Sequence, residues 1–470
     1  MKIIGREQEI VLLKQLYESK EPEFVTVYGR RRVGKTYLIN EHFKEQFAFS
    51  VTALADKSKS AQLKNFHSSL RKYGYKEEVC AGDWYDSFER LIFLLENSRV
   101  KGKKVIFLDE LPWFDTKRSG FLSALEHFWN GWAASRPDVL LIVCGSATSW
   151  MMNRLILNKR GLHNRVTKKL HLSPFTLTEA EQYLIYHDIF WERHDVAIAY
   201  MVLGGIPFYL KQLSPQLSCA QNIDYLCFQK DAPMRNEFNI LFASLFNNPD
   251  KHLKLLEALS RSKCGLTRDQ LLGAAGFSSG GATTTLLTEL EQCGFIERYN
   301  DFLGSRGRYI FQLTDFFTLF YLKQMKGNRQ LTDGYWLKSI GSGTYNNWVG
   351  QTFEKLCLVH VNKIKQALGI SGIIATPFAW RSTQASPGAQ IDLLIDRKDN
   401  CINICECKFT QDPFIVEKEY ATKLRNKMAA FRIETKTRKT LFLTLIASSG
   451  MKQNKYSGMM QNVILLDDLF

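Results

Sequence analysis

The 470-residue sequence predicts an α/β fold, and three apolar runs are the reason. They lie at 24–28, within 103–110 and within 139–146. Strands buried between helices on both faces of a parallel sheet are apolar throughout. A glycine-rich loop follows the first run, two carboxylates end the second, and a serine ends the third. Because ligands bind at the carboxyl ends of strands in such sheets, these polar ends predict a functional site.

The first run leads into Gly29-x4-Gly34-Lys35-Thr36, and a helical pattern follows at 37–43. Glycines let backbone N–H groups turn toward a phosphate, and the next helix presents its positive end. Lys35 is expected to reach the β- and γ-phosphates, and Thr36 to ligate Mg²⁺. The sequence therefore predicts a P-loop nucleotide site, whose expected contacts are Gly29, Arg30, Arg31, Arg32, Val33, Gly34, Lys35 and Thr36.

The second and third runs supply the expected catalytic groups. Asp109 and Glu110 form a Walker B pattern, in which Asp109 holds Mg²⁺ and Glu110 orients or deprotonates the attacking water. Ser146 ends the third run, where a sensor of the γ-phosphate is expected. Arg165 could supply charge to the transition state, in cis or from a neighbouring subunit, or be an ordinary surface arginine.

Five segments together resemble the archaeal ATPase family, a branch of the AAA+-like signal-transduction ATPases with numerous domains (STAND). They are 5–7, 28–36, 108–112, 144–146 and 204–210. The resemblance spans about residues 1–245 and implies ATP as the nucleotide. It also implies that Pro207 lies near the bound base, although a helix-breaking turn explains this proline equally well.

The rest of the chain predicts further domains. Three helical patterns and a hairpin between 246 and 325 predict a winged helix. Its third helix, within 278–290, has no Lys or Arg, which favours a structural or interaction role over base reading. Arg298, Arg306 and Arg308 of the wing could contact phosphate. The expected boundaries are 1–172 for the ATPase domain, 173–245 for a helical lid, 246–325 for the winged helix, 326–346 for a linker and 347–470 for a second α/β domain.

The last domain contains a second candidate catalytic centre. Asp392 lies on one predicted strand, and Glu406 and Lys408 share one face of the next. Two carboxylates can hold Mg²⁺ while a lysine positions water at a phosphodiester. The segment resembles the PD-(D/E)XK nuclease fold, which implies that Asp392, Glu406 and Lys408 are catalytic, Asp392 and Glu406 being metal ligands and Glu354 an accessory one. An exposed charged strand face is the alternative.

The bulk composition limits the partners. A net charge of +15 favours an anionic partner such as nucleic acid, although a solvated basic surface explains it equally well. DNA is expected over RNA only because the nuclease-like fold usually acts on DNA. The sequence contains no run of about 18 apolar residues, so no membrane span is expected. Ten scattered cysteines without a CxxC pair indicate reduced thiols in a cytoplasmic protein.

These patterns predict an ATP-hydrolysing enzyme coupled to a Mg²⁺-dependent nuclease-like or DNA-binding C-terminal domain. A regulatory ATP switch, whose C-terminal domain binds without cutting and whose nucleotide state controls assembly, is the alternative. Homo-oligomer formation is left open. A third interpretation is a nucleic-acid-binding module with a vestigial nucleotide site. It is disfavoured because the nucleotide motifs are intact, namely Gly34, Lys35, Thr36, Asp109 and Glu110.

Overall fold

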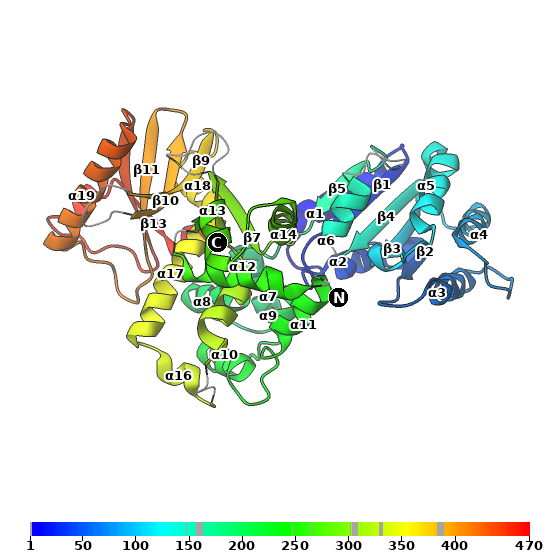
Figure 1. Cartoon of the computed structure of the whole chain (residues 1–470), viewed down its shortest axis with the longest axis horizontal. Coiled ribbons are helices and arrows are strands. Elements are labelled where there is room, and N and C mark those ends of the chain that lie inside the picture. Colours follow the sequence, from blue (N-terminus) through cyan, green and yellow to red (C-terminus); the bar gives the residue numbers. More distant parts are fainter. Residues whose placement is uncertain are drawn as a thin grey trace. The chain divides into compact units, whose positions relative to one another are not determined.

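The computed structural model (Figure 1) consists of two compact units, Met1–Pro174 and Phe175–Phe470. The predicted boundaries after 245, 325 and 346 all fall inside the second unit. The structure describes residues 2–146, 148–156, 162, 164–246, 248–263, 265–300, 302, 309–328, 332–382 and 390–470, without the side chains of Arg381 and Asp392.

The first unit is built on a five-stranded parallel sheet of order β2-β3-β4-β1-β5. This confirms the predicted α/β fold with a parallel sheet. β4 pairs with both β1 and β3, so its carboxyl end lies between the end of the P-loop strand and the end of the Walker B strand. The strands are β1 (Glu23–Tyr28), β2 (Phe47–Thr52), β3 (Lys104–Asp109), β4 (Val139–Gly145) and β5 (Lys168–His171).

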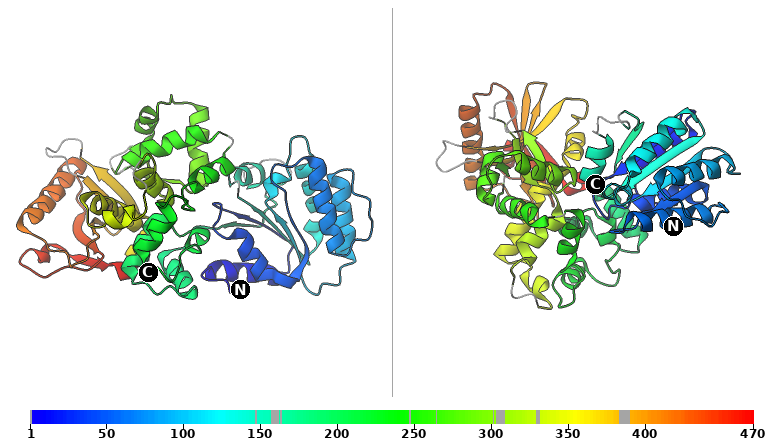
Figure 2. Two further views of the ribbon diagram at one scale, coloured as in Figure 1. Left: turned by 90° about the horizontal axis from the view of Figure 1, so that it is seen from below. Right: turned by 45° about the vertical axis from the view of Figure 1, so that its right-hand side comes forward.

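Helices cover both faces of this sheet (Figure 2). On one face, buried rings of α3, α4 and α5, such as Phe66, Trp84 and Phe128, pack against the strands. On the other, Phe43 of α2 lies 6.2 Å from Phe47, which stacks on Phe107. Both faces of the sheet are therefore covered, and every residue of β3 and β4 is buried. The helical segments are α1 (Glu7–Glu18), α2 (Lys35–Phe43), η1 (Lys44–Gln46), α3 (Lys59–Lys72), α4 (Trp84–Glu96), η2 (Leu111–Trp113), α5 (Phe121–Gly131), η3 (Ala133–Ser135), α6 (Thr148–Trp150) and η4 (Met151–Ile156).

The second unit begins with helices, as the sequence predicts for this stretch. Thr176 and Glu179 form a capping box that starts α7, and α8 is buried from Val196 to Leu203. These helices are α7 (Leu177–Tyr186), α8 (Arg193–Leu203), α9 (Pro207–Leu210), α10 (Cys219–Cys227) and α11 (Glu237–Leu245).

Three helices and a small antiparallel sheet follow, in the order expected between 246 and 325. The sheet has the order β6-β8-β7 and contains one short strand, β6, that the sequence did not predict. Arg298 on β7 pairs with Glu291 at 2.5 Å, and Arg306 and Arg308 lie outside the described residues. The elements are α12 (Pro249–Arg261), β6 (Leu266–Thr267), α13 (Arg268–Ala275), α14 (Gly281–Gln292), β7 (Ile296–Asn300) and β8 (Tyr309–Leu313).

The segment predicted as a linker, 326–346, is packed where the structure describes it. Trp336 is only 2% exposed and stacks on Phe228 at 5.6 Å. The Asp224 carboxylate accepts the backbone N–H groups of Gly334 and Trp336, both at 2.8 Å. The glycines suggested a loose connection, but the tryptophan between them belongs to the core. The elements around this segment are α15 (Phe316–Phe320), η5 (Tyr321–Met325) and α16 (Tyr335–Ser339).

The C-terminal part is a five-stranded sheet of order β13-β12-β11-β10-β9. β9, β10 and β11 are antiparallel, whereas β12 and β13 run parallel to β11. α19 packs on one face, where Leu424 and Phe431 meet Ile402 and Ile404. The elements are α17 (Gly343–Val359), α18 (Val361–Ala367), β9 (Ala375–Arg381), β10 (Gln390–Arg397), β11 (Cys401–Lys408), α19 (Lys418–Thr435), β12 (Thr440–Ala447), η6 (Ser457–Met459), β13 (Asn462–Leu465) and η7 (Leu466–Leu469).

The described residues contain neither a membrane-spanning helix nor a disulfide. Among them, no helix is both long enough and apolar enough to cross a bilayer. Every cysteine that the structure describes is a free thiol.

Candidate functional site

The glycine-rich loop after β1 closes around the Lys35 side chain. Lys35 is the first residue of α2 and is 5% exposed. Its ammonium donates hydrogen bonds to the carbonyl oxygens of Gly29 and Arg30, each at 2.9 Å. Gly34 precedes the helix with a φ of 92° and Gly29 has a φ of 141°, which L side chains rarely adopt. The loop therefore holds a buried cation at the positive end of a helix, a suitable environment for a phosphate.

Gly29→Ala is expected to destabilise the first unit by roughly 1–3 kcal/mol. An added Cβ would lie 2.3 Å from the carbonyl oxygen of Leu172, and the backbone conformation is itself unfavourable for alanine. Urea unfolding followed by circular dichroism measures the change. Gly131→Ala in α5 is the matched control, because its Cβ would meet only His127 at 3.9 Å. Equal unfolding midpoints for Gly29→Ala and the wild type would contradict the close approach of Leu172.

Thr36 and Asp109 come together from α2 and the end of β3. The Thr36 hydroxyl lies 3.1 Å from each oxygen of the Asp109 carboxylate, and the Thr52 hydroxyl lies 3.3 Å from one of them. Asp109 is 2% exposed, and burial followed by the nearby Glu110 charge raises the pKa of its carboxyl group. A buried carboxylate beside a hydroxyl matches the oxygen ligands that Mg²⁺ prefers, and the divalent charge would offset this burial.

Glu110 and Ser146 meet at the ends of β3 and β4. The Ser146 hydroxyl donates to a Glu110 carboxylate oxygen at 2.9 Å, and the Ser146 backbone N–H lies 3.3 Å from the same oxygen. Glu110 has a φ of 50°, a left-handed conformation that is uncommon outside glycine. This turn at the end of the strand separates the Glu110 side chain from that of Asp109, so the two acids have different partners.

Other residues of the loop region differ in exposure. Arg30 and Val33 are buried, whereas Arg31 and Arg32 are partly exposed. The sequence did not single out Arg6, which is 5% exposed and donates a hydrogen bond to the Val33 carbonyl oxygen at 3.2 Å. Its signal was present in the segment 5–7, which carried part of the family resemblance. Thr52 was also missed, because one threonine at the end of a strand has no distinctive pattern.

Residues 3–213 match the model of an ATPase domain that occurs predominantly in Archaea. Over these residues, the chain is similar to an archaeal-type ATPase domain. The match confirms the resemblance over this stretch and ends before the helices, strands and sheets that follow residue 213.

Three other comparisons cover more of the chain. An uncharacterised protein of Methanocaldococcus jannaschii is 26% identical over 371 residues, which is 77% of this chain and 79% of that protein. A Walker-type ATPase of Pyrococcus abyssi has a similar structure, with a TM-score of 0.49, 17% identity, and coverage of 68% of this chain and 96% of that one. A STAND protein of Pyrococcus horikoshii with a tetratricopeptide-repeat sensor has a TM-score of 0.31 and 16% identity, covering 79% of this chain and 52% of that one.

Two further nucleotide contacts were predicted, at Arg165 and Pro207. Arg165 is an exposed residue in a turn of the ATPase domain, where its backbone N–H donates to Leu162. Pro207 is the first residue of α9 and belongs to the second unit. The roles of both residues stay predictions.

The second predicted centre has Glu406 and Lys408 on the face of β11 that α19 covers. Glu406 is 8% exposed and accepts hydrogen bonds from the Tyr420 hydroxyl, at 2.8 Å, and from the Lys427 ammonium. The Lys408 ammonium lies 4.8 Å from the Tyr420 ring centre and 5.6 Å from that of Phe414. Lys427, which the sequence analysis did not identify, is therefore the lysine that pairs with Glu406.

The remaining residues of this centre are only partly described. Asp392 lies on β10, but its side chain is outside the described part of the structure. Glu354 on α17 is half-buried, and its charge contributes to raising the pKa of both Cys407 and Tyr420, the partner of Glu406. Among described residues, no three His, Cys, Asp or Glu side chains are grouped to hold a metal. The described residues alone therefore do not form the predicted metal site.

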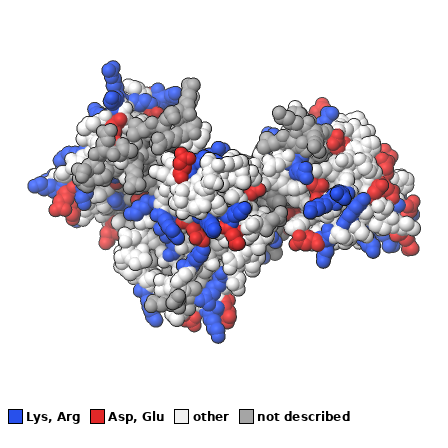
Figure 3. Space-filling view, in the orientation of Figure 1, with Lys and Arg blue, Asp and Glu red and all other residues white. Residues whose placement is uncertain are grey.

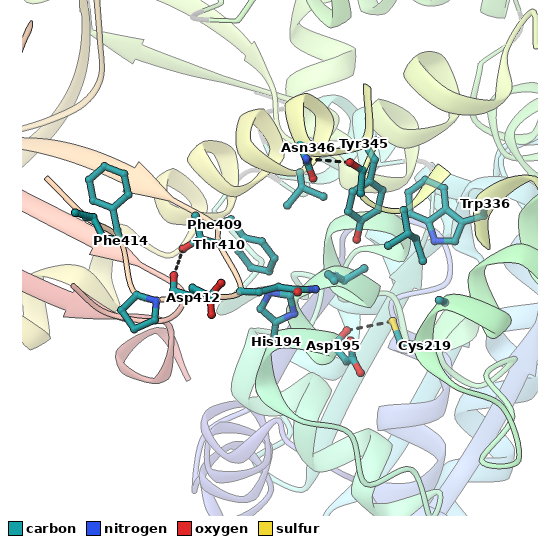
Figure 4. A pocket seen from close by; sticks show the side chains of 18 of the residues that line it. His194, Asp195, Cys219, Trp336, Tyr345, Asn346, Phe409, Thr410, Asp412 and Phe414 are labelled. Atoms are coloured by element: carbon teal, nitrogen blue, oxygen red, sulfur yellow. Dashed lines mark hydrogen bonds between the residues drawn. The ribbon is translucent and has the colours of Figure 1, made fainter. Parts of the chain in front are cut away.

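A cavity of about 930 Å³ adjoins this centre inside the second unit (Figure 4). It shares Phe414 and Tyr420 with the surroundings of Lys408, and other walls come from α8, α10 and α17. Its lining includes the acidic residues Asp195, Asp412 and Glu417, whereas no Lys or Arg is among the described residues that line it. Burial lowers the pKa of His194, which favours the neutral imidazole there. This cavity is therefore unsuited to a polyanion such as a DNA strand.

Proposed function

We propose that the chain binds ATP with Mg²⁺ and hydrolyses it at the P-loop of the archaeal-type ATPase domain. One observation carries the proposal. Lys35, the Thr36–Asp109 pair and the Glu110–Ser146 pair occupy the carboxyl ends of three adjacent strands. Phosphoryl transfer to water requires a cation for the phosphates, oxygen ligands for a metal ion and a carboxylate that orients the attacking water.

Each group has a distinct role in this proposal. Lys35 and the loop N–H groups bind and orient the β- and γ-phosphates. Thr36 and Asp109 hold Mg²⁺, which when bound neutralises charge on the phosphates. Glu110 orients the attacking water and accepts its proton, while Ser146 holds the Glu110 carboxylate and senses the γ-phosphate. Arg165 and Pro207 are proposed as further contacts, on the family resemblance alone.

The test is the steady-state rate of phosphate release from ATP, compared between the wild-type chain and Lys35→Ala. Turnover by the wild type and its loss in the variant are expected, because Lys35 is the buried cation of the loop. Equal rates would contradict the assignment of the P-loop.

A second candidate function is Mg²⁺-dependent cleavage of DNA by the C-terminal part. It is supported by the order of α17, three antiparallel strands, α19 and a parallel strand, as expected for the nuclease-like fold. Against it, Glu406 is engaged by Tyr420 and Lys427, and Lys408 lies over aromatic rings. The alternative is a regulatory ATP switch in which this part binds a partner without cutting.

Cleavage of labelled single- and double-stranded DNA with Mg²⁺ or Mn²⁺, with and without ATP, distinguishes these functions. If the nuclease proposal holds, Glu406→Gln lowers cleavage by roughly 10²–10³-fold, the usual loss for one transition-state contact. Glu419→Gln is the control, because Glu419 is an exposed residue of α19, the helix that covers Glu406. No cleavage by the wild type under any nucleotide condition would favour the regulatory switch.

DNA remains a proposed partner. A homo-oligomeric assembly and a cytoplasmic location are also proposals. The net charge of +15 supports an anionic partner. On the face drawn in Figure 3, however, Lys and Arg side chains are interspersed with Asp and Glu, without one continuous basic stripe. On that face, the described basic side chains therefore offer separate places for contact with an anion.

A further inference from the structure

A smaller cavity of about 230 Å³ lies in the second unit, where α12 and η5 face α17. It is separate from the P-loop and shares no residue with the larger cavity beside Lys408. Most of the described residues that line it have polar side chains.

Three lysines from three elements converge on this cavity. Lys263 follows α12, Lys323 belongs to η5, and Lys355 belongs to α17. No Asp or Glu is among the described residues that line it. Lys355 is only 8% exposed, and its ammonium lies 3.5 Å from the neutral Gln312 side-chain oxygen. Partial burial, and then the charge of Lys263, lower the pKa of Lys323, so these positive charges repel one another.

α17 adds further hydrogen-bond donors along one face. Thr344, Asn347, Trp348, Gln351 and Lys355 recur at helical spacing and all line the cavity. The indole N–H of Trp348, a residue 5% exposed, has no hydrogen-bond partner among the described residues. Thr344 lies in the first turn of α17, where the helix dipole favours an anion.

Three of the four hydroxyls among the described lining residues already donate hydrogen bonds. The side chains of Ser260, Ser262 and Thr352 donate to backbone carbonyl oxygens at 2.7–2.8 Å. The groups that can donate to a ligand therefore include the Lys263 and Lys323 ammoniums, the side-chain amides, the Thr344 hydroxyl and the Trp348 indole N–H. A cavity rich in donors and without carboxylates fits an anionic acceptor.

We propose that this cavity binds a small phosphate-bearing anion, with Lys263 and Lys323 at its rim and Lys355 inside. Its volume is below the roughly 300–1,000 Å³ of common ligand pockets, so the ligand is a phosphate group or little more. A phosphodiester within a DNA backbone would meet the exposed lysines at the rim, whereas a terminal phosphate can enter toward Lys355.

Binding of inorganic phosphate and of pyrophosphate to the full chain, measured by calorimetry and by tryptophan fluorescence, tests the proposal. All chains carry Lys35→Ala, so that the P-loop contributes little. Lys263→Gln with Lys323→Gln is expected to weaken binding by at least roughly tenfold, the effect of losing one charge-assisted contact. Lys355→Gln tests the interior position, and Lys254→Gln on the exposed side of α12 is the matched control.

Weaker binding in the double variant and unchanged binding in Lys254→Gln would support the site. Equal binding by all chains would overturn it, and so would weak, unsaturable binding, which indicates an adventitious ion only. If short single-stranded DNA binds through these lysines while phosphate and pyrophosphate do not, the cavity is a nucleic-acid contact and the proposal is wrong. ATP turnover of the double variant with Lys35 restored should equal that of the wild type, so this test is independent of the proposed ATPase activity.

Discussion

Lys35→Ala is expected to lower the rate of ATP turnover by roughly 10²–10³-fold, the usual loss when one preorganised contact to developing charge is removed. The Lys35 ammonium is buried and held by two carbonyl oxygens of its own loop. Alanine removes the charge that would contact the phosphates, and no other lysine lies within 29–36. ATP affinity should fall as well, since Lys35 would contact the ground-state phosphates. Phosphate release and equilibrium binding of a fluorescent ATP analogue measure the two effects.

The control for this variant is Lys14→Ala. Lys14 lies on α1, and its side chain is 70% exposed. Its rate and its affinity should equal those of the wild type. Circular dichroism of Lys35→Ala should show an intact fold, although the carbonyl oxygens of Gly29 and Arg30 lose this donor. A folded Lys35→Ala that retains wild-type turnover would show that hydrolysis takes place elsewhere.

Glu110→Gln is expected to lower kcat for ATP hydrolysis by roughly 10²–10⁴-fold, the range for a general base, with little change in ATP affinity. The Glu110 carboxylate accepts hydrogen bonds from the hydroxyl and the backbone N–H of Ser146. Glutamine keeps the size of the side chain and can still accept the Ser146 hydrogen bond, but it cannot take a proton from water. The variant should therefore bind ATP and release phosphate very slowly.

Single-turnover hydrolysis, measured beside nucleotide binding, separates these effects. Glu45→Gln is the matched control, because Glu45 is exposed in the short helix after α2. If Glu110→Gln weakens ATP binding as strongly as it slows hydrolysis, Glu110 acts on the bound nucleotide and not on the water. In that case, the assignment of the general base would be wrong.

The ATPase site was largely predictable from the sequence because its groups lie in short, local patterns. Lys35 and Thr36 follow the glycines directly, and Asp109 and Glu110 end a single apolar run. The pairing of Glu110 with Ser146 was not predictable, since the two are 36 residues apart. It depends on β4 lying next to β3, which no local pattern specifies.

In the C-terminal part, fewer of the contacts were predictable from the sequence. Strand alternation correctly placed Glu406 and Cys405 on opposite faces of β11, because side chains on a strand point alternately to its two sides. The partners of Glu406 were not predicted, because Tyr420 and Lys427 lie on a helix that follows the strand. The glycine spacing that suggested a linker at 326–346 gave no sign of the Asp224 contacts that hold Trp336 in the core.

The sequence by itself determined the P-loop, the Walker B acids and the apolar strands of a parallel sheet. Each depends on neighbouring residues, whose chemistry and spacing are set by the backbone of one strand, turn or helix. The tertiary structure alone decided which groups meet: Ser146 with Glu110, Lys427 with Glu406, and three lysines around one small cavity. Such contacts join residues far apart in the chain, and they depend on strand order and helix packing, which are set by burial of the whole apolar surface.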